Sequence, residues 1–309
     1  GFFRDVTLAI RRGSSRGKVV IEIHVVERGT FVLNKLWFGT TNQAPYWLGA
    51  DVGDRNLLGL GIMLGGGIIY AAPGEAQGSR AQWAGELRLA DPSVFGSRWG
   101  WYGSLTLVNG SEPYRVAGTS SETADDFRAF PYRRFGARAG VTYDATALSR
   151  ISAGVRAEEV STNLPVAPTQ TLADGRVVGI DLHLLPGSSR VVTANVGFDR
   201  DTRADPVLPH SGGRVAAAVE LGTAALGSDD TYATLFARYE HWWPLRRERS
   251  AIGIRLGGGL VIGDAPEFDR IYISDVDPML TPRALGMVLS NAAPFSILGT
   301  RADKPAYGD

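Results

Sequence analysis

Apolar and polar residues alternate with a period of two along most of this chain, which is the pattern of β-strands whose two faces meet different surroundings. In residues 214–221 (RVAAAVEL), one face carries only Val, Ala and Leu, whereas the other carries Arg214 and Glu220 beside alanine. The same division recurs in residues 81–89, 134–143, 150–158, 191–199 and 251–257. The sequence therefore predicts an all-β protein.

A two-sheet sandwich in water would alternate in the same way, so periodicity alone leaves that alternative open. The polar faces combine glycine with charged neighbours, a composition suited to a crowded wet interior, as in Glu86 with Arg88, Arg156 with Glu158, and Arg238 with Glu240. Aromatic residues gather at predicted strand ends, namely Trp99, Trp101 and Tyr102 at one start and Tyr239, Trp242 and Trp243 at one end. Both features favour a membrane barrel, whose aromatic girdles lie at the lipid interface.

The predicted connectors alternate between short and long, as in outer-membrane barrels with short periplasmic turns and longer external loops. The short connectors are Asn56–Gly59, Asp91–Ser97, Asp144–Ser149 and Arg246–Ser250, and the long ones are Gly110–Pro131 and Ser161–Arg190. The second long loop contains an alternating run of its own and is expected to project as a small hairpin. Counted in this way, about eleven strands lie between Phe31 and Gly263.

Composition and motifs give little support to catalysis. The 309 residues include no cysteine, which removes disulfides and thiolate metal sites, and 32 basic residues balance 32 acidic ones. Zero net charge gives no general attraction to nucleic acid. The four histidines, His24, His183, His210 and His241, lack metal-ligand spacing. We therefore expect no enzyme, no metal, no cofactor and no nucleic-acid partner.

A stiff, polar connector, DTRADPVLPHSGG, occupies residues 201–213 between two alternating runs. Its two prolines cannot extend either strand, and its glycines provide the backbone freedom to begin the next one. Asp201 and Arg203 are suited to pairing with one another or with nearby turns. A rigid turn that only sets strand register is the alternative reading. The residues singled out are Asp201, Thr202, Arg203, Pro206, Pro209 and Gly212.

At this point the chain resembles the BamA-type outer-membrane insertases, which join periplasmic POTRA modules to a sixteen-stranded barrel. Residues 1–29 look like the second half of a last POTRA module: GFFRDVTL, a turn at GSSRG, then KVVIEIHVVERG. GDRNLLGLG at 53–61 is similar to the family's turn after the second barrel strand, and residues 201–213 resemble its DTRD-type turn. LTPRALG at 280–286 occupies the place of an Arg-Gly-aromatic motif in an inward-folded loop.

The resemblance implies a transmembrane antiparallel β-barrel, with about eleven of sixteen strands in this chain, preceded by the C-terminal part of an α/β POTRA module. The expected domains are residues 1–28, the POTRA part, and 29–309, the first two-thirds of the barrel with a lumen loop at 264–309. Closing strands and further POTRA modules are expected beyond the two ends of the chain, because a barrel must close to satisfy its edges in lipid.

The resemblance also implies roles for single residues. The loop would descend into the lumen, where Arg283 would pair with an acidic residue on a closing strand. The inward charges Glu220, Glu240 and Asp199 are alternative partners. The motif departs from the family pattern, because Gly286 follows Arg283 only after Ala284 and Leu285.

The first strand, residues 31–40 (FVLNKLWFGT), would meet the last strand of the barrel at a weak lateral seam. An open edge presents unpaired N–H and C=O groups that can template an incoming strand. The residues of interest in it are Phe31, Asn34, Lys35, Trp37 and Gly39.

The expected function is therefore an insertase of the bacterial outer membrane, with its POTRA part in the periplasm. Its expected partners are unfolded β-barrel precursors, periplasmic chaperones or accessory lipoproteins, and the lipid bilayer. One alternative is a POTRA-barrel secretion pore that passes a partner polypeptide through its lumen. A passive porin-like channel is a third possibility, and the POTRA-like start argues against it.

Overall fold

The computed structural model describes residues 3–27, 29–41, 44–74, 77–115, 127–162, 169–172, 174–179, 187–206, 208–245, 250–266, 269, 283–285 and 287–288. Among these residues, no helix is long and apolar enough to cross a membrane. The strands are β1 (Phe3–Arg12), β2 (Val19–Glu27), β3 (Phe31–Thr41), β4 (Ala44–Leu57), β5 (Ile62–Ala71), β6 (Gln82–Asp91), β7 (Trp99–Arg115), β8 (Phe127–Thr146), β9 (Ser149–Thr162), β10 (Thr169–Thr171), β11 (Val177–Gly179), β12 (Gly187–Asp201), β13 (Gly212–Gly222), β14 (Tyr232–Pro244), β15 (Ala251–Gly263), β16 (Arg283–Ala284) and β17 (Met287–Val288). Two short 3₁₀ turns are η1 (Val94–Gly96) and η3 (Ala224–Leu226).

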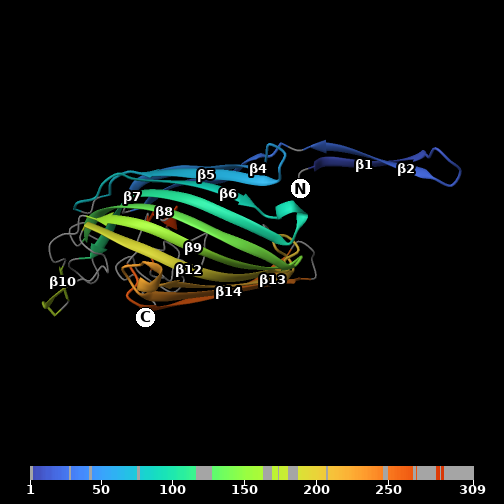
Figure 1. The fold of residues 1–309 in the computed structure, drawn as a ribbon. Coiled ribbons are helices and arrows are strands. Elements are labelled where there is room, and N and C mark those ends of the chain that lie inside the picture. The colour runs from blue at the N-terminus through green and yellow to red at the C-terminus, as the bar shows by residue number, and fades with distance from the viewer. Residues whose placement is uncertain are drawn as a thin grey trace.

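Eleven of these strands form one antiparallel sheet in the order β15-β14-β13-β12-β9-β8-β7-β6-β5-β4-β3. Neighbours in the sheet are also neighbours along the chain, except that β10 and β11 form a separate two-stranded hairpin between β9 and β12. The sheet curls about an axis that runs along its strands (Figure 1). The predicted number of strands and the predicted excursion are both confirmed.

The two faces of the sheet have opposite compositions, as the alternation predicted. Arg134, Arg156 and Glu158 are buried on the concave face, which we call the lumen. Side chains on the other face, such as Phe135, Val155 and Val196, are exposed although they are large and apolar. A sandwich in water buries its apolar face against a second sheet. Among the described residues nothing covers this one, which is the arrangement of a lipid-facing barrel.

Two of the six aromatic residues assigned from the sequence to an outer girdle face the lumen instead. Trp99 lies on the outer face against Tyr143, with the ring centroids 4.8 Å apart. The hydroxyl of Tyr102, in contrast, lies where a Cβ atom at Gly140 or Gly154 would be. Trp242 similarly lies over Gly253 and close to Arg255. The inner face has room for these rings because the opposing positions are glycine.

One of the long connectors is shorter than the sequence suggested. The connection predicted at Gly110–Pro131 is largely strand, because β7 continues to Arg115 and pairs there with Phe127 at the start of β8. At the opposite end of the sheet, the connections at 58–61, 92–98, 147–148 and 202–211 are two to ten residues long. We call this opposite end the turn end of the sheet.

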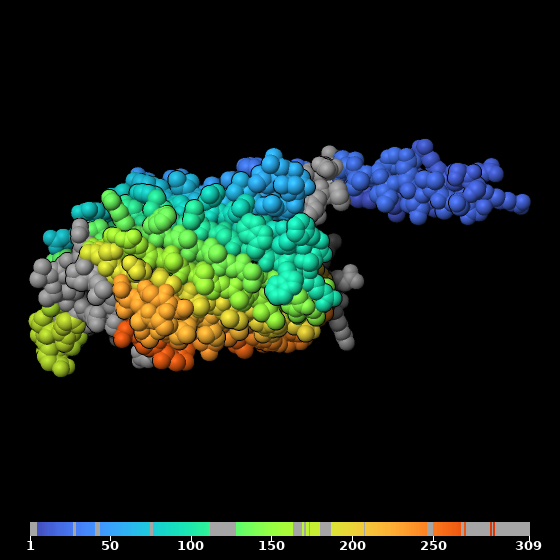
Figure 2. Space-filling view, in the orientation of Figure 1, coloured from blue at the N-terminus to red at the C-terminus, as the bar shows by residue number. Residues whose placement is uncertain are grey.

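The β1–β2 hairpin projects as an arm from the turn end (Figures 1 and 2). Its pairing places Val6 opposite Val25, Leu8 opposite Ile23 and Ile10 opposite Ile21. These six residues share one face, and all of them are exposed. An isolated hairpin with a continuous apolar face is only marginally stable in water, so this face requires a cover.

Candidate functional site: the lumen loop, the first-strand edge and the turn at 201–213

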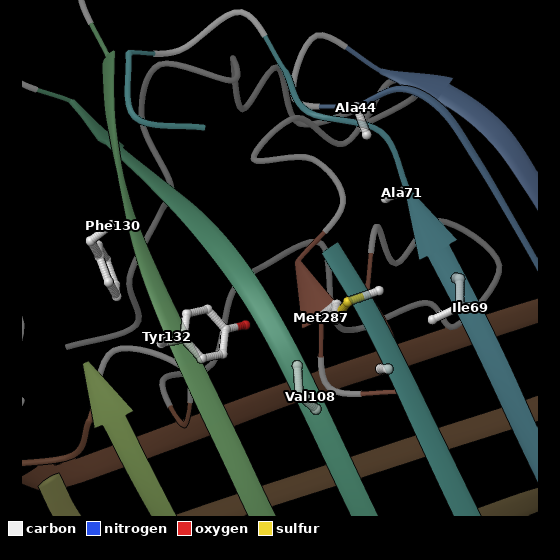
Figure 3. Close-up of a cluster of buried hydrophobic side chains, with 8 residues drawn as sticks. Ala44, Ile69, Ala71, Val108, Phe130, Tyr132 and Met287 are labelled. Atoms are coloured by element: carbon white, nitrogen blue, oxygen red, sulfur yellow. The ribbon is translucent and has the colours of Figure 1, made fainter. Parts of the chain in front are cut away.

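The lumen loop is described at two places, its start after β15 and the β16–β17 hairpin. The hairpin lies in the lumen, where Met287 is fully buried against Ile69, Ala71, Ala84 and Val108 (Figure 3). Leu285 packs against the same cluster. The part of the loop that carries the predicted motif is therefore seated on the wall formed by β5, β6 and β7.

The predicted motif residues are only partly described. The backbone of Arg283 pairs with Val288 in the hairpin, whereas its side chain and the whole of Gly286 lie outside the described residues. The three acidic residues considered as partners for Arg283 each pair with another arginine. Asp199 pairs with Arg214, Glu220 with Arg156, and Glu240 with Arg203.

The start of the lumen loop is bound to the wall through Asp269. Arg156 of β9 donates two hydrogen bonds to this carboxylate, Nη1 to Oδ1 at 3.0 Å and Nη2 to Oδ2 at 2.6 Å. The hydroxyl of Tyr232 on β14 donates to Oδ2 at 2.6 Å. Burial by itself would raise the pKa of Asp269, but the charge and hydrogen bonds of Arg156 outweigh it and lower this pKa to about 2.

Arg156 also binds two carboxylates of the wall. Its Nη2 atom lies 2.5 Å from Oε1 of Glu220, and its Nη1 atom lies 3.3 Å from Oε1 of Glu158. Glu158 in turn accepts from Arg134 Nη2 at 2.5 Å. Thr193 of β12 accepts from Arg156 Nε at 3.4 Å and donates to Glu220 Oε1 at 2.8 Å. Five strands, β8, β9, β12, β13 and β14, thus contribute to one network of buried charges and hydroxyl groups.

The first strand, β3, is an edge of the sheet and pairs, within the described residues, only with β4. The register between β3 and β4 shifts at Asn34, whose side chain donates to Asp51 Oδ1 at 2.8 Å. Asp51 is almost fully buried and also binds Arg88 Nη2. The irregular point of the edge is therefore tied to a charge pair inside the lumen.

The other predicted residues of β3 divide between its faces. Phe31 is exposed, and Lys35 lies with its Nζ atom 6.0 Å from the centre of the Trp37 ring. Trp37 packs against the cluster that holds Met287. Packing explains the glycine at position 39, because a Cβ atom there would clash with the ring of Trp47. Trp37 therefore lies on the inner side of the edge strand, against the same cluster that includes Met287 of the lumen loop.

The turn at 201–213 is organised by its first three residues. Arg203 donates from Nη2 to Asp201 Oδ2 at 2.6 Å, and its Nη1 atom lies 3.4 Å from Glu240 Oε2. Thr202 accepts from the backbone N–H of Gly213 at 3.0 Å and donates to its carbonyl at 2.9 Å.

Gly212 adopts φ = 85°, and a Cβ atom there would meet the carbonyl oxygen of Thr202. Glycine is therefore required at this position. Pro206 is exposed and Pro209 is half-buried in the same turn. The pairing that the sequence suggested for Asp201 and Arg203 is present.

Sequence reasoning missed Asp269, Asp51 and Met287 as members of the site. Arg156 and Glu158 were recognised as inward charges, but nothing in the local pattern pairs Arg156 with a residue 113 positions later. In the described part of the chain, no group of three or more His, Asp or Glu side chains is arranged to hold a metal ion.

Comparison with known proteins identifies the family. The Omp85 superfamily domain matches residues 56–275. The crystal structure of BamA from Haemophilus ducreyi lacking POTRA domains 1–3 is similar in fold, with a TM-score of 0.60, 15% identity, and coverage of 88% of this chain and 49% of that one. CdiB from Escherichia coli gives a TM-score of 0.53, 8% identity, and coverage of 87% and 47%.

This chain spans about half the length of both solved structures. No curated protein sequence matches it. The family domain covers most of the chain, including nine of the eleven strands of the sheet in full, so the chain belongs to the Omp85 superfamily.

Proposed function

We propose that this chain is the central part of an outer-membrane insertase that folds β-barrel precursors at a lateral seam beside β3. The Omp85 fold implies that the protein is located in the bacterial outer membrane. The observation that carries the proposal is the packing of Trp37, on the edge strand, against the cluster that seats Met287 of the lumen loop. Movement of the loop and pairing at the edge would therefore affect one another.

An edge strand supplies what a templating mechanism needs. β3 is eleven residues long, about the length that spans a bilayer in a barrel, and one of its sides is unpaired within the described residues. Its outer face carries Phe31, Leu36 and Phe38, all exposed. A precursor strand could pair with this edge while its own apolar face meets lipid, and no catalytic group is required.

The arm at residues 3–27 supports the proposed domain division at residue 28. Its exposed apolar face fits the sheet of a POTRA module whose remaining part covers it. In this proposal, the module lies in the periplasm and receives unfolded precursors there. Its partners in this step are periplasmic chaperones or accessory lipoproteins. Arg283, with Gly286, would hold the tip of the lumen loop on a closing strand.

A secretion pore is the second candidate, and the lumen itself favours it. Arg138 and Arg255 have side chains that are 53% and 45% exposed on the inner face, so the wall presents charge to water. A hydrated, charged wall suits the passage of an extended polypeptide as well as it suits a gated insertase.

Liposomes that contain the full-length protein would decide between these functions. The insertion rate of an unfolded outer-membrane barrel should exceed that in empty liposomes, and Arg283→Ala should lower it. Arg176→Ala, in an exposed pair with Asp174 on the β10–β11 hairpin, is the control and should leave the rate unchanged. Ion conductance without any acceleration of insertion would favour the secretion pore.

A further inference from the structure

The lumen loop enters the lumen immediately after β15. The backbone N–H of Asp264 donates to the carbonyl of Thr231 at 3.0 Å. Ala265 and Pro266 are fully buried, and Ala265 packs with Val160, Val191 and Tyr232. Asp269 then reaches Arg156, so residues 264–266 together with Asp269, which we call the loop entry, have a binding place of their own.

Arg156 is suited to hold this entry because a guanidinium offers five N–H donors in a fixed plane. Its side chain is only 4% exposed, and that of Asp269 is 12% exposed. The two donors that meet Asp269 form a bidentate pair, which fixes direction as well as distance. Lysine, with a single ammonium group, could not reproduce this geometry.

The wall would remain electrostatically satisfied if the loop entry left. Arg156 would keep Glu158 and Glu220, both of which belong to the strands of the sheet. The departing carboxylate of Asp269 would regain its hydration in the lumen water. A buried arginine that loses its only acidic partner strongly destabilises the fold. Arg156 would instead keep two of its three acidic partners. The contact can therefore open and close without disrupting the sheet.

The loop entry and the β16–β17 hairpin are held at different parts of the wall. Asp269 contacts Arg156 on β9 and Tyr232 on β14, whereas Met287 lies against β5, β6 and β7. Leu285 of the hairpin lines a small cavity of about 110 Å³ together with Arg134 and Glu158 of the wall, and neither Asp269 nor Met287 takes part in its lining.

We propose that Arg156 is a positioning residue that forms a releasable latch for the loop entry, separate from the seat of the hairpin. The latch allows the first part of the lumen loop to leave the wall while Met287 keeps the hairpin in place. Its role concerns the position of the loop, and it stands whether the protein inserts precursors or secretes a polypeptide.

The test measures how fast a maleimide reacts with single cysteines in the full-length protein in lipid vesicles, with any cysteine elsewhere replaced. Ala265→Cys reports the loop entry and Met287→Cys reports the hairpin; this part of the chain has no cysteine of its own. Only molecules with the gel mobility of the folded barrel are scored. No client protein is present, so the result does not depend on the proposed function.

Asp269→Asn keeps the size of the side chain and removes its charge. It should raise the labelling rate at position 265 by about tenfold or more and change the rate at position 287 by less than about twofold. Arg156→Lys should give an intermediate increase at position 265. Asp174→Asn, the same change in an exposed pair, should alter neither rate.

An unchanged rate at position 265 in Asp269→Asn would overturn the latch. Equal increases at 265 and 287 would overturn the separation of the two attachments, because the loop would then move as one body.

Discussion

Acidic and basic side chains in the lumen are buried to different depths. The side chains of Asp51 and Glu240 are 2% and 6% exposed, whereas Arg88, which binds Asp51, is 38% exposed. A short carboxylate remains at the wall, while the long arginine stem carries its charge towards water. Arg134, Arg156 and Arg203 depart from this rule. Arg134 pairs within the wall, whereas Arg156 and Arg203 each join the wall to a connecting segment.

Arg203 should contribute measurably to stability because it is 9% exposed and joins Asp201 to Glu240. Arg203→Ala should lower the free energy of unfolding by about 2 kcal/mol, which is less than the usual loss for a buried pair. The loss is moderated because Glu240 keeps the more distant Arg238, at 3.8 Å. Urea titration of the folded gel mobility in lipid vesicles would measure it.

The control for Arg203→Ala is Arg176→Ala, in a pair whose side chains are 73% and 51% exposed. This change should cost less than about 0.5 kcal/mol, as is usual for surface pairs. If both substitutions lowered the free energy of unfolding by the same small amount, the turn at 201–213 would be held by its backbone hydrogen bonds alone.

The latch at Asp269 should be insensitive to pH across the physiological range. Its folded pKa of about 2 lies below the ordinary value of 3.8, so the ionised carboxylate stabilises the folded state at pH values above 3.8. This contribution is lost only as the pH falls from 3.8 towards 2. The labelling rate of Ala265→Cys, divided by that of an exposed Thr169→Cys, should therefore be equal at pH 8 and pH 5. A clear rise of this ratio at pH 5 would show that Asp269 already takes up a proton there.

At the scale of elements, the edge strand β3 gives a direct test of the seam. A photo-crosslinking amino acid at Phe38, exposed on β3, should capture an inserting precursor. The same amino acid at Leu105, exposed on β7, should not, because β7 is paired on both sides. Mass spectrometry of the crosslinked products would identify the site. Equal capture at both positions would mean that the precursor only touches the outer surface.

The elements themselves were largely predictable from the sequence. Alternation fixed the faces of residues 134–143 and 214–221 because the side-chain period of a strand is two whatever its partner. The ends of β7 and β8 were missed because residues such as Glu112 and Pro113 are typical of loops, yet they pair with Phe130 and Ala129. Local composition does not show that a neighbouring strand continues.

The candidate site was less predictable than the strands for the same reason. Tyr102 was assigned to the outer girdle, and its inward position depends on glycines at 140 and 154 in two other strands. The latch joins Arg156 to Asp269 across a long stretch of chain. Contacts of this kind follow from the register of the whole sheet, and a single sequence without aligned relatives does not reveal them.

At the scale of the whole molecule, the curled sheet separates an apolar outer surface from a charged lumen. Leu105 and Thr106 on β7 are consecutive residues that point to opposite faces. Leu105 lies opposite Leu87 and Ala137, whereas Thr106 lies opposite Glu86 and Gly136. The two positions share one depth along the strand and differ only in the face that they occupy.

Arginine at these two positions should therefore have opposite consequences. Leu105 lies between Trp99, near the turn end, and Asn109, which is paired with Trp83, so it is close to the middle of the apolar band. Leu105→Arg should destabilise the folded protein in lipid vesicles by about 2–4 kcal/mol, the cost of a lipid-facing arginine at the bilayer midplane.

Thr106→Arg should cost clearly less than Leu105→Arg, because Thr106 lines a cavity of about 110 Å³ inside the lumen and lies directly opposite Glu86, whose carboxylate attracts the added charge. Urea titration of both variants in the same vesicles would measure the difference. Detergent micelles adapt to a polar group on the outer surface. In micelles, the difference in unfolding free energy between the two variants should therefore be smaller than in vesicles. Equal losses in vesicles would mean that the outer face does not meet lipid at this depth, and the assignment of outside and inside would then have to be reversed or abandoned.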